Sequence, residues 1–453
     1  MVMKKNILYC LISAAAMFFA GCTFDERLTS SDRIVEGVPT TVNINFGIDG
    51  GQVYTRAEEN PSVNESRVSN LYVMVFDSDG NRVSTTNNDG VETAFFYEPQ
   101  GGLIVNPGSP VTGSVSFNVP SMTGATVVAV ANISEGGVTT VYTLSKATLD
   151  DITTLQGFKD LVVPAMESVI RGNNMLMSAM AENVTISGPE QDATMDCDLV
   201  LRRIDAKIKV VLTSSPSNSA WTDFSFQPKT WRVRRVPGQS RLVPFDNPAA
   251  KAGPWAEIGT GSTSAWDANG SYFDTREFEF EDLESEDRDN TLYYSGGSFS
   301  FYMPENRKVA KKSVSEYALR EKRAADGTFE YANDNSTYLE ITGYISYKDG
   351  GQVINAEVTF YVHLGYAKSD MNPNPDLNDY DTRQNGSYTY NITVTGVNNI
   401  VVEVEQGDEN RPGYEGDVVV SADVIEVDAH YETRTLDIPL DSPFETMTWG
   451  VRT

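Results

Sequence analysis

Alternating apolar and polar residues mark residues 40–76 as two strands joined by a polar loop. In the first strand every second residue is apolar, namely Val42, Ile44, Phe46 and Ile48. Successive side chains of a strand point to opposite faces, so these four share one face. A more apolar strand, Leu71 to Phe76, follows and ends in the turn at residues 77–81.

One arginine lies in the loop between these strands, in the sequence Thr55-Arg56-Ala57. A protease that cuts after Arg56 would detach residues 41–48 from the body of the protein. Loss of that strand would leave an apolar groove where it had packed. The residues alone allow two interpretations of Arg56, a processing site or an ordinary exposed arginine in a loop.

Further strand patterns, separated by turn residues, continue along the chain and predict antiparallel β-sandwiches. They fall at residues 115–119, 125–131, 175–181, 184–186, 201–210, 299–304, 338–347, 356–364 and 388–395. Leu149, Ile152 and Leu155 recur at helical spacing behind Thr148, which predicts a short helix with Thr148 as its N-cap. The fold class is therefore all-β with short helices in loops.

These patterns divide the chain into consecutive parts. We expect a signal peptide at 1–21, a tether at 22–39, β-sandwiches at 40–197 and 198–405, a linker at 406–416 and a β extension at 417–453. The extension holds strand patterns at Val418 to Val427 and around Leu436, Ile438 and Leu440. Because so few strands cannot form their own core, the extension is either an appended pairing module or a truncated domain.

The amino terminus has the pattern of a lipoprotein signal peptide. Lys4 and Lys5 precede an apolar run at residues 7–20, which is too short for a stable membrane span. The run ends in Phe19-Ala20-Gly21-Cys22, which resembles a bacterial lipobox. We therefore expect acylation of Cys22 and an outer-membrane lipoprotein at the cell surface; the alternative is a plain signal peptide that contains Cys22.

Charge and composition exclude several classes of function. The 453 residues carry a formal net charge of −28, which argues against nucleic acid or anionic lipid as the principal partner. Hydrophobic residues make up 40% of the chain, as in ordinary globular proteins. Of the three cysteines only Cys197 lies in the body, and the two histidines, His363 and His430, are far apart. The chain therefore has few of the residues that disulfides, zinc sites and histidine-based catalysis need.

Sequence motifs of hydrolases and phosphate loops are not found, so we predict no enzymatic activity and no cofactor. Residues 370–381 place Asp or Asn at six ligand positions of a calcium loop. Pro375, however, stands where the loop requires glycine, and Asp381 replaces the bidentate glutamate. We therefore predict a polar loop between strands and no metal site.

Two further features allow a binding function. Residues 307–323 form a basic cluster that is either a solvated surface or a contact with an acidic neighbour. Exposed tryptophans could form a sugar-binding platform, although core packing is the ordinary role of such residues. The candidates are Trp221, Trp231, Trp255 and Trp266. A glycan-binding surface lipoprotein of a carbohydrate-uptake system is therefore the alternative function.

The order of several motifs resembles the fimbrillins, the subunit family of type V pili. The motifs are the lipobox at Cys22, the alternating strand, Thr55-Arg56-Ala57, Glu65 to Phe76, Val127 to Asn132, Met175 to Ser178, Leu201 to Ile208 and Asn385 to Gly396. The resemblance implies two tandem transthyretin-like β-sandwiches in a pilus subunit for the stalk, tip or anchor. Residues 407–453 exceed the simple stalk pattern.

The same resemblance implies how the subunit would mature and assemble. Cys22 would carry lipid, an Arg-specific surface protease would cut between Arg56 and Ala57, and residues 41–48 would be the removable strand. Assembly would then proceed by strand exchange with other pilin subunits and support adhesion to a host or bacterial surface ligand. β-Augmentation provides the physical basis, since a neighbour's strand restores the backbone ladder and fills the side-chain pockets.

Overall fold

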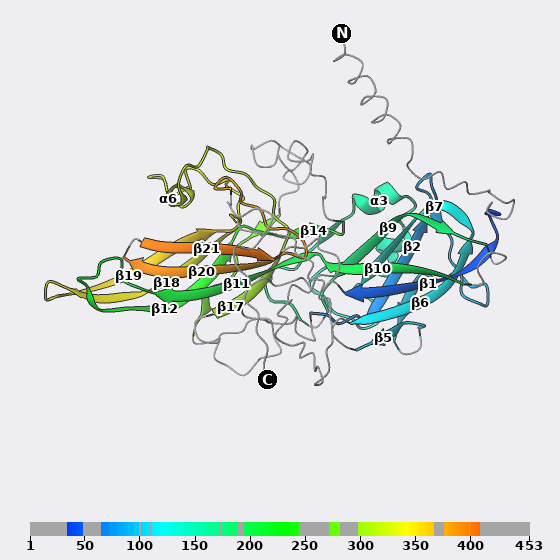
Figure 1. Ribbon diagram of the computed structural model, residues 1–453, viewed down its shortest axis with the longest axis horizontal. Coiled ribbons are helices and arrows are strands. Elements are labelled where there is room, and N and C mark those ends of the chain that lie inside the picture. Colours follow the sequence, from blue (N-terminus) through cyan, green and yellow to red (C-terminus); the bar gives the residue numbers. More distant parts are fainter. Residues whose placement is uncertain are drawn as a thin grey trace, which may run out of the picture.

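The computed structural model is an elongated molecule in which two β-sandwiches lie end to end (Figure 1). It describes residues 34–48, 65–98, 101–107, 111–172, 174–188, 194–243, 271–280, 298–366, 376–397 and 399–407. The all-β class predicted from the sequence is confirmed. No helix within these described ranges is both long and apolar enough to cross a membrane.

The N-terminal sandwich is built around one continuous path of strands. The strands are β1 (Pro39–Ile48), β2 (Asn70–Phe76), β3 (Arg82–Val83), β4 (Phe95–Tyr97), β5 (Ile104–Asn106), β6 (Thr112–Pro120), β7 (Met122–Ala131), β9 (Met177–Ile186) and β10 (Met195–Arg203). Their order is β3-β2-β7-β9-β10-β1-β6-β5, with β4 also paired to β2. β10 pairs with β1 over residues 195–201 and with β9 at residues 202–203, so it joins the two layers.

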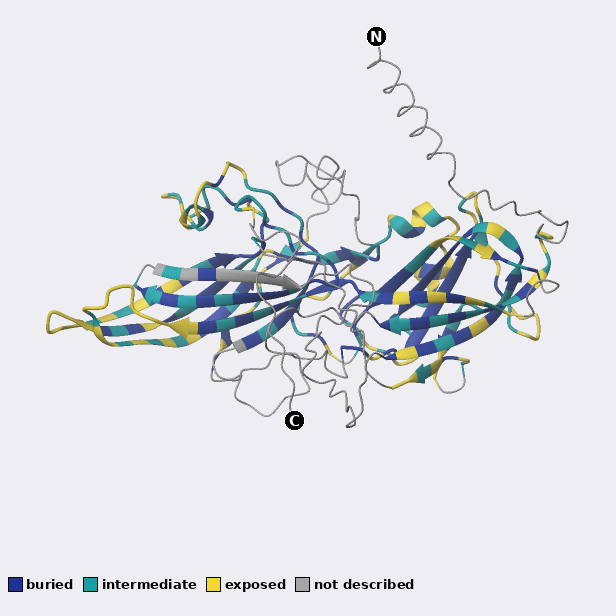
Figure 2. Cartoon of the chain, in the orientation of Figure 1, coloured by how far each residue is buried: buried dark blue, intermediate teal, exposed yellow. Residues whose placement is uncertain are grey.

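A third layer covers the outer face of β2 and β7, which are buried along most of their length (Figure 2). It contains α2 (Lys146–Asp150), α3 (Leu155–Lys159) and β8 (Val162–Pro164), which pairs with β14 (Gln239–Arg241). The predicted helix boundary at Thr148 is wrong. The Ser145 side chain caps α2, and the Thr154 side chain caps α3 by accepting a hydrogen bond from the Gly157 amide.

The C-terminal sandwich contains two four-stranded sheets, β17-β11-β20-β21 and β16-β12-β18-β19. Their bounds are β11 (Asp205–Ser214), β12 (Thr222–Arg234), β16 (Phe278–Glu279), β17 (Ser298–Pro304), β18 (Tyr338–Asp349), β19 (Gln352–His363), β20 (Ser387–Gly396) and β21 (Asn399–Gly407). Short elements complete it, namely β13 (Val236–Pro237), β15 (Tyr272–Phe273) and α6 (Tyr317–Arg320). Trp231 is fully buried between the sheets and stacks on Phe299 with ring centroids 4.3 Å apart.

Among the described strands, two ladders are parallel, whereas the sequence predicts antiparallel sandwiches. β1 is parallel to β10, and β11 is parallel to β20, while the other ladders are antiparallel. Only Ile204 separates β10 from β11, so the chain passes from one sandwich to the next within a single residue. The predicted boundary at 197/198 falls inside β10. The predicted extension at 417–453 and most of the linker at 406–416 lie outside the described residues.

Candidate functional site

β1 lies between β6 and β10 and supplies the strand that connects them (Figure 1). Residues 39–47 run antiparallel to residues 112–120 of β6. Residues 42–48 run parallel to residues 195–201 of β10. β1 is therefore an inner strand of its sheet, although it lies near the start of the described chain.

The four apolar side chains predicted to share a face are buried in the core of the N-terminal sandwich. Val42, Ile44, Phe46 and Ile48 are between 0% and 5% exposed. Phe46 lies over Gly113 of β6, where an added Cβ would come within 2.3 Å of the ring. The absence of a side chain at position 113 thus creates the space for an aromatic side chain at position 46.

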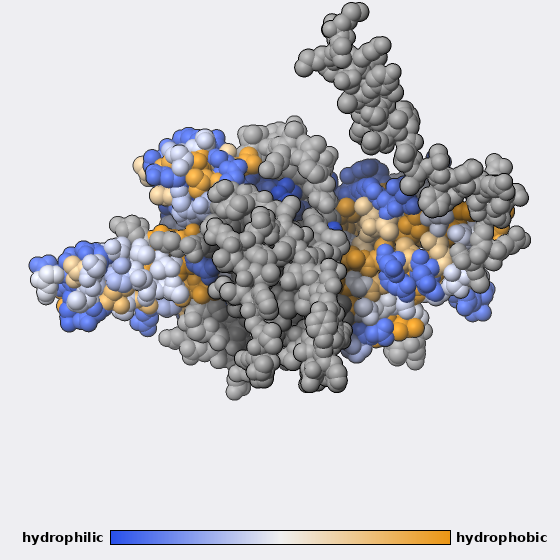
Figure 3. Space-filling model, in the orientation of Figure 1, coloured by the Kyte–Doolittle hydropathy of each residue, from blue (hydrophilic) through white to orange (hydrophobic). Residues whose placement is uncertain are grey.

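The opposite face of β1 is polar and makes side-chain hydrogen bonds to both neighbouring strands. The amide groups of Asn43 and Asn45 each donate to a carboxylate on β10, to Asp196 and Asp198 respectively, at 3.2 Å. The Thr41 hydroxyl donates to Asn118 Oδ1 on β6 at 2.7 Å. On the visible face of the N-terminal sandwich, hydrophilic side chains lie among apolar ones (Figure 3).

Backbone contacts hold both ends of β1. Before the strand begins, the Gly37 amide donates to the Ser121 carbonyl at 2.8 Å, and the Val38 amide donates to Ser121 Oγ at 3.0 Å. At the other end, the Ile48 amide donates to the Val111 carbonyl at 3.1 Å. β1 is therefore fixed along its whole length by interactions that any replacement strand would have to reproduce.

The space between β6 and β10 that β1 fills is called the groove of β1. A buried ionic cluster lies where this groove reaches the C-terminal sandwich. The Glu65 carboxylate, 4% exposed, accepts hydrogen bonds from Arg203 at 3.0 Å, from Lys207 at 2.9 Å and from the Tyr302 hydroxyl. Burial would raise the pKa of Glu65, but the adjacent Lys207 and Arg203 outweigh it and hold the pKa below its usual value. Glu65 is the first described residue after the loop, and its contacts link this part of the chain to both sandwiches.

A second ion pair reinforces the same junction. Arg171 makes two hydrogen bonds to the Asp205 carboxylate, at 2.7 and 2.9 Å, and both side chains are almost completely buried. The Tyr142 hydroxyl donates to the same carboxylate at 2.5 Å. The sequence alone did not identify these clusters, because charged residues are ordinarily exposed. The close run of Arg203, Asp205 and Lys207 around an apolar residue was the available signal.

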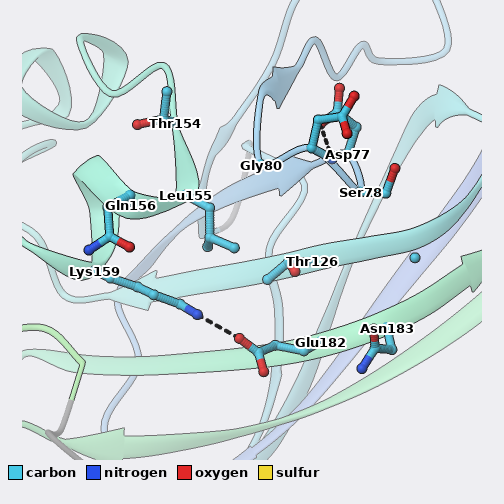
Figure 4. A pocket seen from close by; sticks show the side chains of 12 residues that line it. Asp77, Ser78, Gly80, Thr126, Thr154, Leu155, Gln156, Lys159, Glu182 and Asn183 are labelled. Carbon is cyan, nitrogen blue, oxygen red and sulfur yellow. Dashed lines mark hydrogen bonds and ion pairs between the residues drawn. The ribbon is translucent and has the colours of Figure 1, made fainter.

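A polar depression of about 610 Å³ lies between the β2–β3 turn, α3 and β9 (Figure 4). In Figure 4, Lys159 and Glu182 point toward one another and form an ion pair at 2.7 Å. The Asp77 carboxylate accepts hydrogen bonds from the Asp79 and Asn81 amides, as in the hairpin turn predicted from the sequence. Because these charged groups already have partners, the depression is a weaker candidate than the groove of β1.

The basic cluster at residues 307–323 is partly solvated, as one of the two interpretations expected, since Lys311, Lys312, Lys322 and Arg323 are exposed. Several of its charges are nevertheless paired within the chain. Arg307 pairs with Asp381 at 2.8 Å, and Lys311 pairs with Asp334 at 2.6 Å. Arg320 is buried, and its guanidinium donates to three backbone carbonyls. Arg307 and Lys311 therefore have their acidic partners in the same chain.

The other predicted binding features are only partly described. Trp231 is a core residue, which removes it from the sugar-binding platform. Trp221 stacks on Tyr347 at 4.3 Å, whereas Trp255 and Trp266 lie outside the described residues. In the calcium-like loop, Asp376 accepts a hydrogen bond from the Asn378 amide. Among the residues whose positions are described, no group of three or more His, Cys, Asp or Glu could hold a metal ion.

The predicted lipidation and processing residues, Cys22, Arg56 and Ala57, lie outside the described residues. Cys197, by contrast, lies inside the groove of β1, opposite Ile44 in the parallel ladder. Burial, together with the charge of Asp198, raises the pKa of the Cys197 thiol to about 11. The thiol is therefore protonated at neutral pH and packs as a small apolar group.

Comparisons with solved structures found the following similar proteins. The tip fimbrial protein Mfa3 from Porphyromonas gingivalis, with a C-terminal truncation, is 16% identical over 82% of this chain and 99% of that chain, with a TM-score of 0.44. A putative cell adhesion protein from Parabacteroides distasonis is 15% identical over 82% and 100%, with a TM-score of 0.48. The fimbrial anchor protein Mfa2 from P. gingivalis is 13% identical over 82% and 98%, with a TM-score of 0.32.

No curated protein matches the chain. Residues 36–233, which include β1, β6, β10 and the junction, match the family of fimbrillin-A associated anchor proteins Mfa1 and Mfa2. This match confirms the resemblance to the fimbrillins that the sequence predicted, and it relates this part of the chain to the fimbrial anchor proteins of that family.

Proposed function

We propose that the chain is an accessory or structural subunit of a cell-surface pilus that assembles by exchange of β1 for a strand of a neighbouring subunit. The observation that carries this proposal is the position of β1 between β6 and β10 with an apolar face that fills the core. Removal of β1 would expose two unpaired strand edges and four side-chain pockets. A strand from another subunit could fill both.

Covalent attachment explains why β1 would stay in place before processing. Burial of its four apolar side chains contributes about 6–12 kcal/mol in gross transfer terms, an upper bound because the unfolded chain is partly collapsed. While the strand is tethered, its effective concentration at the groove is far higher than that of a competing strand. Cleavage at Arg56 removes the connection between β1 and the body.

The described ends of the loop favour Arg56 as the processing site. Ile48 lies opposite Leu201, and Glu65 binds Arg203, so both ends of the loop meet the chain near the end of β10. Sixteen residues, 49–64, connect these neighbouring positions, and Arg56 is near their middle. Such a connection is much longer than the short span requires, which leaves chain length for a protease to engage.

In this proposal Cys22 carries the lipid that attaches the precursor to the outer membrane, and residues 22–39 form the tether. The body lies outside the cell, where the Arg-specific protease and the other pilin subunits meet it. The position in the pilus would then be terminal or near the membrane, as for the anchor family that residues 36–233 match.

The test is to treat purified precursor with a limiting Arg-specific protease and add a fluorescent peptide with the sequence of residues 39–48. The cut protein should bind the peptide and release its own β1, whereas uncut protein and Arg56→Ala should not. Mass spectrometry of the fragments identifies the site of cleavage. Peptide binding that is equal in cut and uncut protein, or a cut only at another arginine, would contradict the proposal.

A further inference from the structure

Three rows of side chains cross the outward face of β1 between β6 and β10. The rows, as the two ladders align them, are Ser116–Asn43–Asp196, Ser114–Asn45–Asp198 and Thr112–Gly47–Val200. These positions alternate with the four buried ones, so they contact solvent and not the core. A replacement strand would place its own side chains in the same rows.

The first two rows favour hydrogen-bond donors in the central strand. Asp196 and Asp198 are both exposed on one face of β10, two residues apart, and each accepts a hydrogen bond from an asparagine of β1. An acidic side chain in the central strand would lie beside one of these carboxylates. Like charges in neighbouring strands destabilise a sheet, whereas amide or basic side chains would be favoured.

The third row is incompletely filled by β1. A Cβ added to Gly47 would have no heavy atom within 4 Å, and Val200 beside it is 53% exposed. Glycine within a strand also loses more conformational entropy on folding than other residues. A β-branched apolar side chain at this position would cover part of Val200 and fit an extended backbone.

We infer that the groove of β1 selects a strand from a different subunit, with donor side chains at the positions of Asn43 and Asn45 and a β-branched apolar residue at the position of Gly47. The inference rests on the proposed function, because it specifies the partner in the same exchange. β1 then fills its groove incompletely, and its replacement by the matched strand adds favourable contacts.

The strand patterns in the C-terminal extension of this chain do not meet these requirements. If Leu436, Ile438 and Leu440 fill three consecutive pockets in the direction of β1, Asp437 faces Asp196 in one register and Asp198 in the other. The groove of a second copy would therefore bind residues 436–440 less tightly because of charge repulsion.

The other pattern, at residues 418–427, fits poorly for a different reason. With Val418, Val420, Ala422 and Val424 in the four pockets, alanine replaces Phe46 over Gly113 and leaves that space partly empty. In the same register Asp423 lies beside the exposed apolar Val200. The matched strand is thus expected in another protein and not in a second copy of this chain.

The experiment compares peptides that compete for the groove of protein cut at Arg56, at low ionic strength, where exposed charges are least screened. The reference peptide has the sequence of residues 39–48. Its Gly47→Val variant should bind at least about threefold more tightly, and its Asn43→Asp, Asn45→Asp variant about three- to tenfold more weakly. Peptides 415–428 and 433–443 should bind more weakly than the reference.

Two further results separate this inference from the proposed function. Failure of the reference peptide to enter the groove would overturn the proposed exchange itself. Equal binding of the reference, Gly47→Val and double-Asp peptides would overturn only the selectivity. In uncut protein, Gly47→Val should raise Tm, and Asn45→Asp should lower it unless Asp198→Asn is also present. A Tm change that Asp198→Asn does not reverse would contradict the assignment of Asp198.

Discussion

The ring of Phe46 occupies space that exists because residue 113 is glycine. A Cβ at position 113 would lie 2.3 Å from Phe46 Cζ and 2.4 Å from the Ile104 carbonyl oxygen. Both distances are too short for real atoms, and one neighbour is backbone that cannot move away easily. The pairing of β1 with β6 therefore depends on this glycine as well as on the apolar side chains of β1.

Gly113→Ala should lower the free energy of unfolding by about 1–3 kcal/mol, because the added methyl group would clash with the Phe46 ring. Urea denaturation followed by circular dichroism measures this change. Gly47→Ala is the matched control on the same sheet, since its added Cβ meets no atom within 4 Å. Equal effects of the two substitutions would contradict the packing that the structure shows around Phe46.

Glu65→Gln should lower the free energy of unfolding by about 3–5 kcal/mol at pH 7, because Arg203 and Lys207 would lose their buried counter-charge. The exposed pair of Lys229 and Glu357 offers the control Glu357→Gln, which should change stability by less than about 0.5 kcal/mol.

Glu65 also predicts a pH dependence. Its pKa is lower in the folded protein than the ordinary value of 4.5, so its stabilisation is present above pH 4.5 and is lost as the pH falls below it. Wild type should therefore lose more stability than Glu65→Gln between pH 5 and pH 3. Parallel pH profiles of the two proteins would show that Glu65 does not act through its charge.

Glu305 predicts the opposite dependence at higher pH. Burial raises its pKa from 4.5 to about 7; the charge of Arg307 opposes this shift, and that of Asp381 adds to it. Because the folded-state pKa is the higher one, stability should fall as the pH rises from about 4.5 to about 7, by up to about 3 kcal/mol. Glu305→Gln should remove this part of the slope in Tm measured from pH 5 to pH 8. An unchanged slope would assign the titration to another group, such as the neighbouring Asp379, whose pKa burial raises to about 7.

Replacement of Cys22 tests the membrane attachment that the lipobox predicts. Cys22→Ala should leave unacylated precursor and move the protein from the membrane fraction to the soluble fraction. Metabolic labelling with a fatty acid and cell fractionation measure both effects, and Cys197→Ala is the control for loss of a thiol. A mutant that fractionates with the membrane as wild type does would show that Cys22 is not the anchor.

Residue patterns along the chain predicted many of the strands because these strands alternate or are continuously apolar, but the long strand β12 at residues 222–234 was not among them. β1 and β7 are clear examples, since their apolar positions follow the burial of the side chains. The sequence could not predict that β1 is parallel to β10, because this pairing joins segments about 150 residues apart and depends on the path of the chain between them.

The candidate site was predicted only in part for similar reasons. The buried face of β1 followed from its period of two, but its polar partners did not. Asp196 and Asp198 can be identified as hydrogen-bond partners of Asn43 and Asn45 only once the strand register is known. The burial of Glu65 also required the structure, since a charged residue beside a polar loop is ordinarily exposed.

The most direct test of the account is to prevent β1 from leaving its groove and then ask whether the cut protein still exchanges strands. Cys197 lies opposite Ile44 in the parallel ladder, so Ile44→Cys places two thiols on adjacent inward positions. After oxidation and cleavage at Arg56, the disulfide-linked protein should neither release β1 nor bind the peptide of residues 39–48. Reduction should restore both. Mass spectrometry confirms the disulfide state of each form. If the oxidised and reduced forms bind the peptide equally, β1 is not the strand that is exchanged.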